Sequence, residues 1–122
     1  MKIWKIEVEF KIGKRNEKSE VVYTLFSFGR DFLLLIGGGE PHIGSLAGSD
    51  KGRQKIHHYT LEKHKEENIV TEAAREIYHA TDCEILVVGG IHYEHITTDQ
   101  IQTIERNCRL LRDKIINWIN TN

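Results

Sequence analysis

Hydrophobic and polar residues alternate with a period of two at the start of the chain. The apolar members, Trp4, Ile6, Val8, Phe10 and Ile12, fall on one side, and lysines and glutamates occupy the positions between them. This alternation predicts a strand with one face buried and the other in water. The polar residues 13–18 that follow are typical of a turn.

Further apolar segments predict the rest of an antiparallel sheet. Residues 20–28 are rich in β-branched and aromatic side chains, which favour a strand. The continuous apolar run Phe32–Ile36 is typical of a central strand covered on both faces, and it completes a three-strand meander. The three glycines of residues 37–39 and the single proline that follows should interrupt regular structure. Shorter strands are expected at residues 43–47, 55–61 and 83–88.

Two helices are predicted by periodicity near 3.6. In residues 65–80, Ile69, Ala73 and Ile77 form an apolar stripe. The last helix opens at Thr97 or Thr98, and Thr97 with Gln100 has the spacing of a capping box. Its apolar stripe should cover the sheet, with a dimer seam as the alternative; the stripe comprises Ile101, Ile104, Cys108, Leu111, Ile115 and Trp118. The expected fold is one α+β domain over residues 1–122, with an antiparallel sheet of five to six strands and two helices.

Composition and charge narrow the classes of partner. The chain has 122 residues and a net charge of −1, so it carries no excess of Lys and Arg for nucleic acid or an anionic membrane. Hydrophobic residues make up 39% and charged residues 29%, which indicates an ordered globular protein. The N-terminus begins on a strand pattern without a signal peptide, and no apolar run reaches the ~18 residues of a membrane span. These features predict a cytoplasmic protein.

The sequence gives little support for nucleophilic catalysis. Cys83 and Cys108 lie in apolar patterns and form no CxxC pair, so both are expected to be small buried hydrophobes. Ser45 and Ser49 lie outside any GxSxG motif, and no HExxH motif is present. We therefore expect no catalytic residue.

Three segments combine glycine with histidine where a strand meets a loop or a helix: residues 37–44, 61–66 and 89–95. Glycine lets the backbone approach a ligand closely or adopt a positive φ. If the strand between the helices is parallel to its neighbour, two of these segments share one sheet edge. His64 and Lys65 near a helix N-terminus would add a cation and a positive dipole end, which suits a phosphate.

These segments leave other functions open. The glycines do not form GxGxxG or GxxxxGK[ST] motifs, and a histidine at a strand end is usually a surface residue. We expect His42, His64 and His92 to lie around one surface cleft, and a small metal-binding or hydrolytic enzyme that uses these histidines is an alternative. A further alternative is a homo-oligomeric assembly module that binds no small ligand.

The same segments resemble one known family. The resemblance rests on the glycine-rich loop with Pro41–Gly44, on His64–Glu67, and on Gly90–Tyr93 followed by a Thr-capped helix. These motifs are similar to the prenylated flavin chaperone domains, the small accessory proteins associated with gallate- and vanillate-type decarboxylases. That family is related in shape to proteasome assembly chaperones.

The resemblance implies a non-catalytic protein that holds prenylated FMN, or FMN, and passes it to a decarboxylase apoenzyme. The candidate cofactor contacts that it implies are Gly38, Gly39, His42, Gly44, His64, Lys65, Gly90 and His92. Lys65 would bind the phosphate and Tyr93 or Tyr59 would offer an aromatic wall. The apolar run at residues 32–36 and the edge strands of a small sheet need covering, which predicts a homodimer or larger homo-oligomer.

Overall fold

The computed structural model describes residues 4–61 and 66–122. Its elements, in chain order, are β1 (Trp4–Ile12), the short 3₁₀ helix η1 (Arg15–Glu17), β2 (Val21–Phe28), β3 (Asp31–Gly39), β4 (Ser45–Asp50), β5 (Lys55–Thr60), α1 (Glu66–Thr81), β6 (Ile85–His92) and α2 (Thr98–Thr121). The predicted α+β class, the N-terminal meander and the long C-terminal helix are confirmed.

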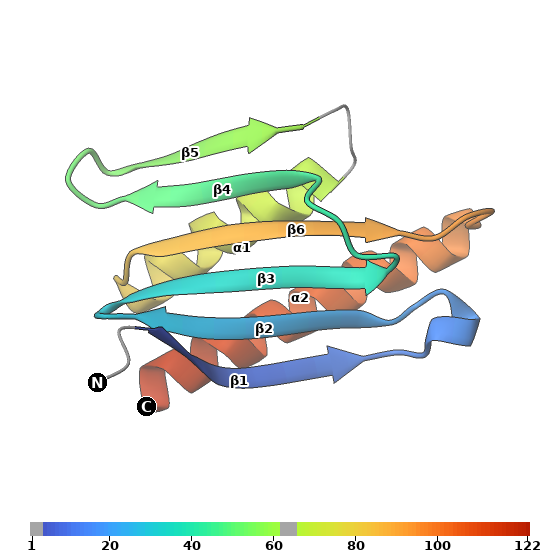
Figure 1. Cartoon of the computed structure of the whole chain (residues 1–122), viewed down its shortest axis with the longest axis horizontal. Coiled ribbons are helices and arrows are strands. Elements are labelled where there is room, and N and C mark those ends of the chain that lie inside the picture. The colour runs from blue at the N-terminus through green and yellow to red at the C-terminus, as the bar shows by residue number, and fades with distance from the viewer. Residues whose placement is uncertain (1–3, 62–65) are drawn as a thin grey trace.

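The strands form one six-stranded sheet in the order β1-β2-β3-β6-β4-β5. Neighbouring strands are antiparallel except for β3 and β6, which are parallel, so the sheet is mixed. Both helices lie on the same face of this sheet, α1 behind β4 and β6 and α2 behind β1 and β2 (Figure 1). The fold is therefore a two-layer arrangement.

The core lies between the helices and the sheet. As predicted, the α2 stripe covers the sheet: Ile104, Cys108, Leu111 and Ile115 are buried. It therefore faces the chain's own sheet. The α2 capping box is also confirmed, because Thr97 Oγ1 accepts a 3.1 Å hydrogen bond from the Gln100 amide and the Gln100 side chain accepts one of 2.8 Å from the Thr97 amide.

The prediction that the five apolar residues of β1 share one buried face is wrong. The pairing of β1 with β2 shifts between Ile6 and Val8, which marks a β-bulge. A bulge adds one residue to a strand and so reverses which face the following side chains occupy. Val8 packs on the helix-covered core, whereas Trp4 and Ile6 lie on the opposite face and are 57% and 60% exposed.

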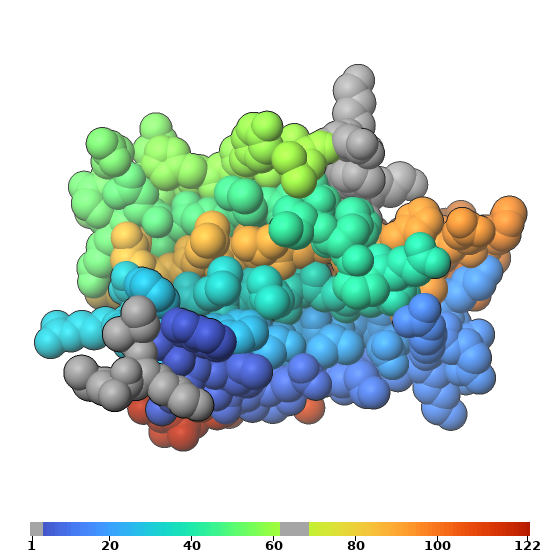
Figure 2. Space-filling view, viewed as in Figure 1, coloured from blue at the N-terminus to red at the C-terminus, as the bar shows by residue number. Residues whose placement is uncertain are grey.

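Within the single chain, the helices cover Phe32–Ile36 on one face only, whereas the apolar run predicts cover on both. Leu34 and Ile36 are buried beneath the helices, but Leu35 between them is 39% exposed. In the described part of the chain, both helices lie on the other side of the sheet, and the strands' own side chains form the surface in Figure 2. We call this surface the open face. It carries Trp4, Ile6, Phe26, Phe28, Leu33, Leu35, Leu46, Tyr59, Leu86 and Val88.

The glycine runs do not end their strands, contrary to the prediction. β3 continues through Gly39 and β6 runs on to His92, with Gly37 opposite Gly90 and Gly39 opposite His92 in the parallel ladder. Glycine keeps its backbone donor and acceptor, so the ladder can continue. The absence of a side chain is needed here: a Cβ on Gly89 would lie only 2.7 Å from Ile36 Cβ.

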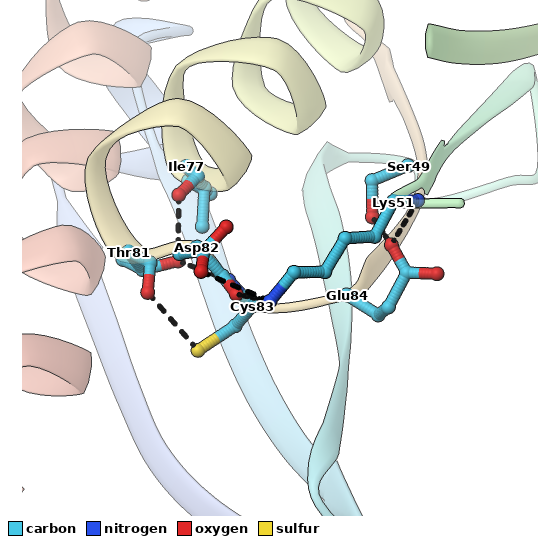
Figure 3. Close-up of polar contacts among 7 residues, drawn as sticks. All are labelled: Ser49, Lys51, Ile77, Thr81, Asp82, Cys83 and Glu84. Atoms are coloured by element: carbon cyan, nitrogen blue, oxygen red, sulfur yellow. Dashed lines mark hydrogen bonds and ion pairs between the residues drawn. The ribbon is translucent and has the colours of Figure 1, made fainter. Parts of the chain in front are cut away.

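Polar contacts hold the opposite end of β6 against β4 and α1 (Figure 3). Ser49 Oγ accepts a 2.8 Å hydrogen bond from the Ile85 amide and donates one of 2.8 Å to Glu84 Oε1. The same carboxylate oxygen accepts from the Lys51 amide at 3.0 Å, and Lys51 Nζ pairs with Asp82 at 2.9 Å. These contacts fix where β6 enters the sheet.

We expect Ser49→Ala to lower the free energy of unfolding by about 1–3 kcal/mol, because it leaves the Ile85 amide without its acceptor. Urea titration followed by circular dichroism measures this. Ser27→Ala is the control: Ser27 Oγ also donates to a glutamate, Glu7, but holds no backbone amide of β6. Equal effects of the two substitutions would contradict the role given to Ser49.

Candidate binding site

The parallel pairing of β3 and β6 brings two of the glycine–histidine segments to one sheet edge. Parallel strands end at the same edge, so residues 37–44 and 89–92 lie side by side there. The rings of His42 and His92 meet edge to face with centroids 6.3 Å apart. The expectation that these two segments share an edge is confirmed, whereas His64 and Lys65 of the third segment lie outside the described residues. We call residues 37–44 and 89–92 the glycine edge.

His42 packs against two glycines. A Cβ on Gly90 would overlap the His42 carbonyl oxygen and lie 2.8 Å from ring atom Cε1, and a Cβ on Gly44 would lie 3.3 Å from Nε2. Nδ1 of the ring lies 3.3 Å from the carbonyl oxygen of Glu40. Gly44 and Gly90 therefore make room for the imidazole.

Gly38 and Gly39 permit the close approach of two other segments. A Cβ on Gly38 would overlap the carbonyl oxygen of Glu20. Gly39 has a φ of +64°, and a Cβ there would overlap the carbonyl oxygen of His92. These two glycines thus fit β3 between the start of β2 and the end of β6.

Arg15 brings a cation to this edge, although it is not among the contact residues predicted from the sequence. Its guanidinium donates a 2.8 Å hydrogen bond to the carbonyl oxygen of Gly39. A guanidinium carries five N–H donors in a planar fork, and this bond uses one of them. The polar turn at residues 13–18 indicated a connection between strands, and nothing in its pattern showed that it would reach a segment 24 positions away.

The turn that carries Arg15 is held in place by the residues after β6. Lys18 Nζ donates to the carbonyl oxygen of Glu94 at 2.7 Å, and Tyr93 Oη donates to that of Glu20 at 2.9 Å. The buried Asn107 of α2 donates to the carbonyl oxygen of Ser19 at 2.9 Å. Arg15 therefore has a defined position although its side chain is exposed.

A cavity of about 500 Å³ opens beside the glycine edge. Its lining includes open-face side chains of three strands, Val22, Leu35 and Val88. We call it the edge hollow. It combines a mainly apolar floor with one arginine at its border; the lining residues are Arg15, Glu20, Val22, Thr24, Leu35, Ile36, Gly37, Gly38, Gly39, Pro41, His42, Ile43, Val88 and Gly89.

A second cavity, of about 960 Å³, lies between α1 and α2 on the helix-covered side of the sheet. His92 and Tyr93 line it together with Cys108, whose thiol pKa is raised to about 12 by burial. Arg112 pairs with Glu72 across the two helices at 2.8 Å. His42 and His92 are thus neighbours that border different cavities. Gly38, Gly39 and His42 line the edge hollow, while Gly44 and Gly90 support His42.

The two cysteines differ in burial. Cys108 is buried as predicted, while Cys83 is half-buried with its Sγ 3.4 Å from the Thr81 carbonyl oxygen. Both cysteines are free thiols. Within residues 4–61 and 66–122, no three His, Cys, Asp or Glu side chains are grouped so that they could hold a metal ion.

The fold and site define a small α+β domain with a largely apolar cavity at the carboxyl ends of its parallel strands, as in many ligand-binding domains. The model of the prenylated flavin chaperone LpdD-like domain matches residues 15–120. The chain belongs to this family, and the family predicted from its glycine–histidine segments is thereby confirmed.

A solved structure supports the fold. A chain from the crystal structure of a chaperone complex for yeast 20S proteasome assembly superposes with a TM-score of 0.55 at 11% sequence identity, covering 98% of each chain. At this identity the likeness concerns the fold alone. No curated protein gives a significant match to the chain. None of the described helices has the length and apolar character needed to span a membrane.

Proposed function

We propose that this chain is a non-catalytic cytoplasmic carrier that binds prenylated FMN, or FMN itself, at the edge hollow and delivers it to a decarboxylase apoenzyme. The observation that carries the proposal is the edge hollow, where a largely apolar floor lies beside an exposed guanidinium in a member of the prenylated flavin chaperone LpdD-like family. A flavin phosphate has these two parts, an aromatic ring system and an anion.

The floor suits a flat ring system. Gly37 and Gly90 are opposite one another on β3 and β6, and neither carries a side chain that would stand above the sheet. Leu35 and Val88, also opposite one another, continue this floor along the same two strands. The volume of about 500 Å³ is within the ~300–1,000 Å³ common for ligand pockets.

Arg15 suits the phosphate. Guanidinium groups bind phosphate oxygens through paired, charge-assisted hydrogen bonds. Arg15 borders the hollow, and its bond to Gly39 holds it beside the glycine edge. His64 and Lys65 remain in the proposed set of contacts, along with His42 and the glycines.

The two tyrosines proposed as an aromatic wall lie away from the hollow. Tyr93 lines the cavity between the helices and donates its hydroxyl hydrogen to the Glu20 carbonyl oxygen. Tyr59 lies on the open face of β5 and does not line the hollow. We therefore assign the ring contact to the floor of Val22, Leu35 and Val88 instead.

Co-expression with the enzyme that prenylates FMN tests the proposal. The purified chain should carry the flavin absorption bands, and mass spectrometry of the extracted ligand should give the mass of prenylated FMN. The loaded chain, mixed with a decarboxylase apoenzyme and passed through a desalting column, should restore decarboxylation. A colourless protein that also fails to bind added FMN would contradict the proposal and favour a ligand-free assembly module.

A further inference from the structure

The geometry points to a second copy of this chain as the partner of the open face, and we propose that this pairing covers the edge hollow of each copy. The pairing itself follows from the open face alone. The covering of the hollow rests on the proposed flavin site. Two flavins would then lie inside one dimer, each shielded from water by the opposite protomer.

The open face exposes a large apolar area. Six of its large side chains, Trp4, Ile6, Phe28, Leu35, Tyr59 and Leu86, are 39–60% exposed. An aromatic side chain offers roughly 150–250 Å² of surface and an aliphatic one somewhat less, so the three aromatic and three aliphatic residues together expose on the order of 600 Å². That is at the upper limit of the ~300–600 Å² typical for the largest patch of a monomer. With the half-buried residues between them, it approaches the ~800 Å² per partner of a standard interface.

The charges bordering the face allow a copy of the same chain to lie on it. On the β1 side, Lys11 pairs with Glu20 at 3.7 Å. On the β4–β5 side, Asp50 pairs with Arg53 at 2.8 Å and with His57 at 3.2 Å. Since these acidic and basic groups are paired within the chain, two identical faces can meet without a strong repulsion. The net charge of −1 adds little repulsion between two copies.

Face-to-face stacking is favoured over pairing through the edge strand β1. The outer strand β1 contains the bulge after Ile6 and carries Lys5, Glu9 and Lys11, which are features that discourage edge pairing. Stacked sheets instead pack their side chains about 10 Å apart, as in β-sandwiches. The open face, which has the apolar area, would be buried in that arrangement.

Pairing through this face would also complete the flavin site. Val22, Leu35 and Val88 belong to the open face and also line the edge hollow. A second sheet lying on the face would therefore cover the floor on which the flavin ring is proposed to lie. In a single copy that side of the ring would remain in water.

Multi-angle light scattering of the whole chain tests the pairing. We expect the wild type to have twice the mass of one chain at micromolar concentration. Leu86→Glu and Phe28→Glu should each give the monomer mass while keeping the circular dichroism spectrum, because both side chains are exposed. Leu110→Glu is the matched control, since Leu110 is 48% exposed on α2, away from the open face, and this variant should remain dimeric. A monomeric wild type, or dimers of both open-face variants, would overturn the inference.

Titration with FMN tests the covering of the hollow. Leu86 does not line the hollow, yet Leu86→Glu should weaken FMN binding at least tenfold, whereas Leu110→Glu should leave the affinity unchanged. A monomeric Leu86→Glu variant with wild-type affinity would overturn the covering. A wild-type dimer that binds no flavin would overturn the proposed function and the covering with it, but the scattering result would still support the pairing.

Discussion

Replacing Gly39 by alanine should lower the free energy of unfolding by about 2–6 kcal/mol. Two costs combine at this position. A non-glycine residue at positive φ is strained by about 1–3 kcal/mol. The new Cβ would in addition overlap the His92 carbonyl oxygen and lie 3.0 Å from the Tyr93 ring, and overpacking of this kind costs about 1–3 kcal/mol.

Gly29→Ala separates the two costs. Gly29 has nearly the same φ, +63° against +64° for Gly39, but nothing lies within 4 Å of its added Cβ. This variant should therefore show the strain alone, about 1–3 kcal/mol. Urea unfolding of both variants measures the difference. Equal losses would mean that the close approach of β3 to His92 is not needed for stability.

Replacing Arg15 by alanine should weaken FMN binding by about 10–150-fold, equivalent to the ~1.5–3 kcal/mol of a charge-assisted hydrogen bond. Isothermal titration calorimetry measures the two dissociation constants. Because Arg15 is exposed and extends from a short turn, the fold should be retained. The Gly39 carbonyl oxygen would lose its Arg15 donor, so the unfolding curve should accompany the titration.

Two controls make the Arg15 result specific to the phosphate. Lys14→Ala removes a neighbouring cation that does not line the hollow, and it should change the affinity less than about twofold. Riboflavin, which lacks the phosphate, should bind the wild type and the Arg15→Ala variant equally. If riboflavin binding falls as far as FMN binding, Arg15 acts on the shape of the hollow and not on the phosphate.

The elements of the fold could be predicted because each has a strong local pattern. The α2 helix is indicated by Thr97, Gln100 and an apolar stripe, and all of these signals depend on residues close in sequence. Glycine runs are different. Their ladder partners lie far away in the chain, so only the assembled sheet shows that Gly37 continues a strand opposite Gly90.

The errors about burial have the same origin. Alternation places Trp4 and Val8 on the same face of β1 provided that the strand has no bulge. Nothing in the sequence marks the extra residue. The apolar run of β3 indicates that both faces avoid water, but it does not say whether a helix or another molecule provides the cover. Leu35 illustrates this, because it belongs to the apolar run and yet is exposed in the single chain, where no helix covers it.

The candidate site was predictable in part. The glycine and histidine segments placed His42 and His92 at one edge, since parallel strands end together. Arg15 was not predictable, because its place depends on a turn held by Tyr93 and by the carbonyl oxygen of Glu94, which lie 73 and 76 positions from their partners in the chain. A residue brought to a site by long-range contacts leaves no local signal.

The location of bound flavin tests the proposed function most directly. Backbone amide resonances of the ¹⁵N-labelled chain, recorded during titration with FMN, report which residues the ligand contacts. We expect the largest shifts on Val22, Gly37–Gly39, His42 and Val88–Gly90, in and next to the edge hollow. Shifts concentrated instead on Ile101–Arg112, in the cavity between the helices, or no shifts at all, would contradict the proposed function.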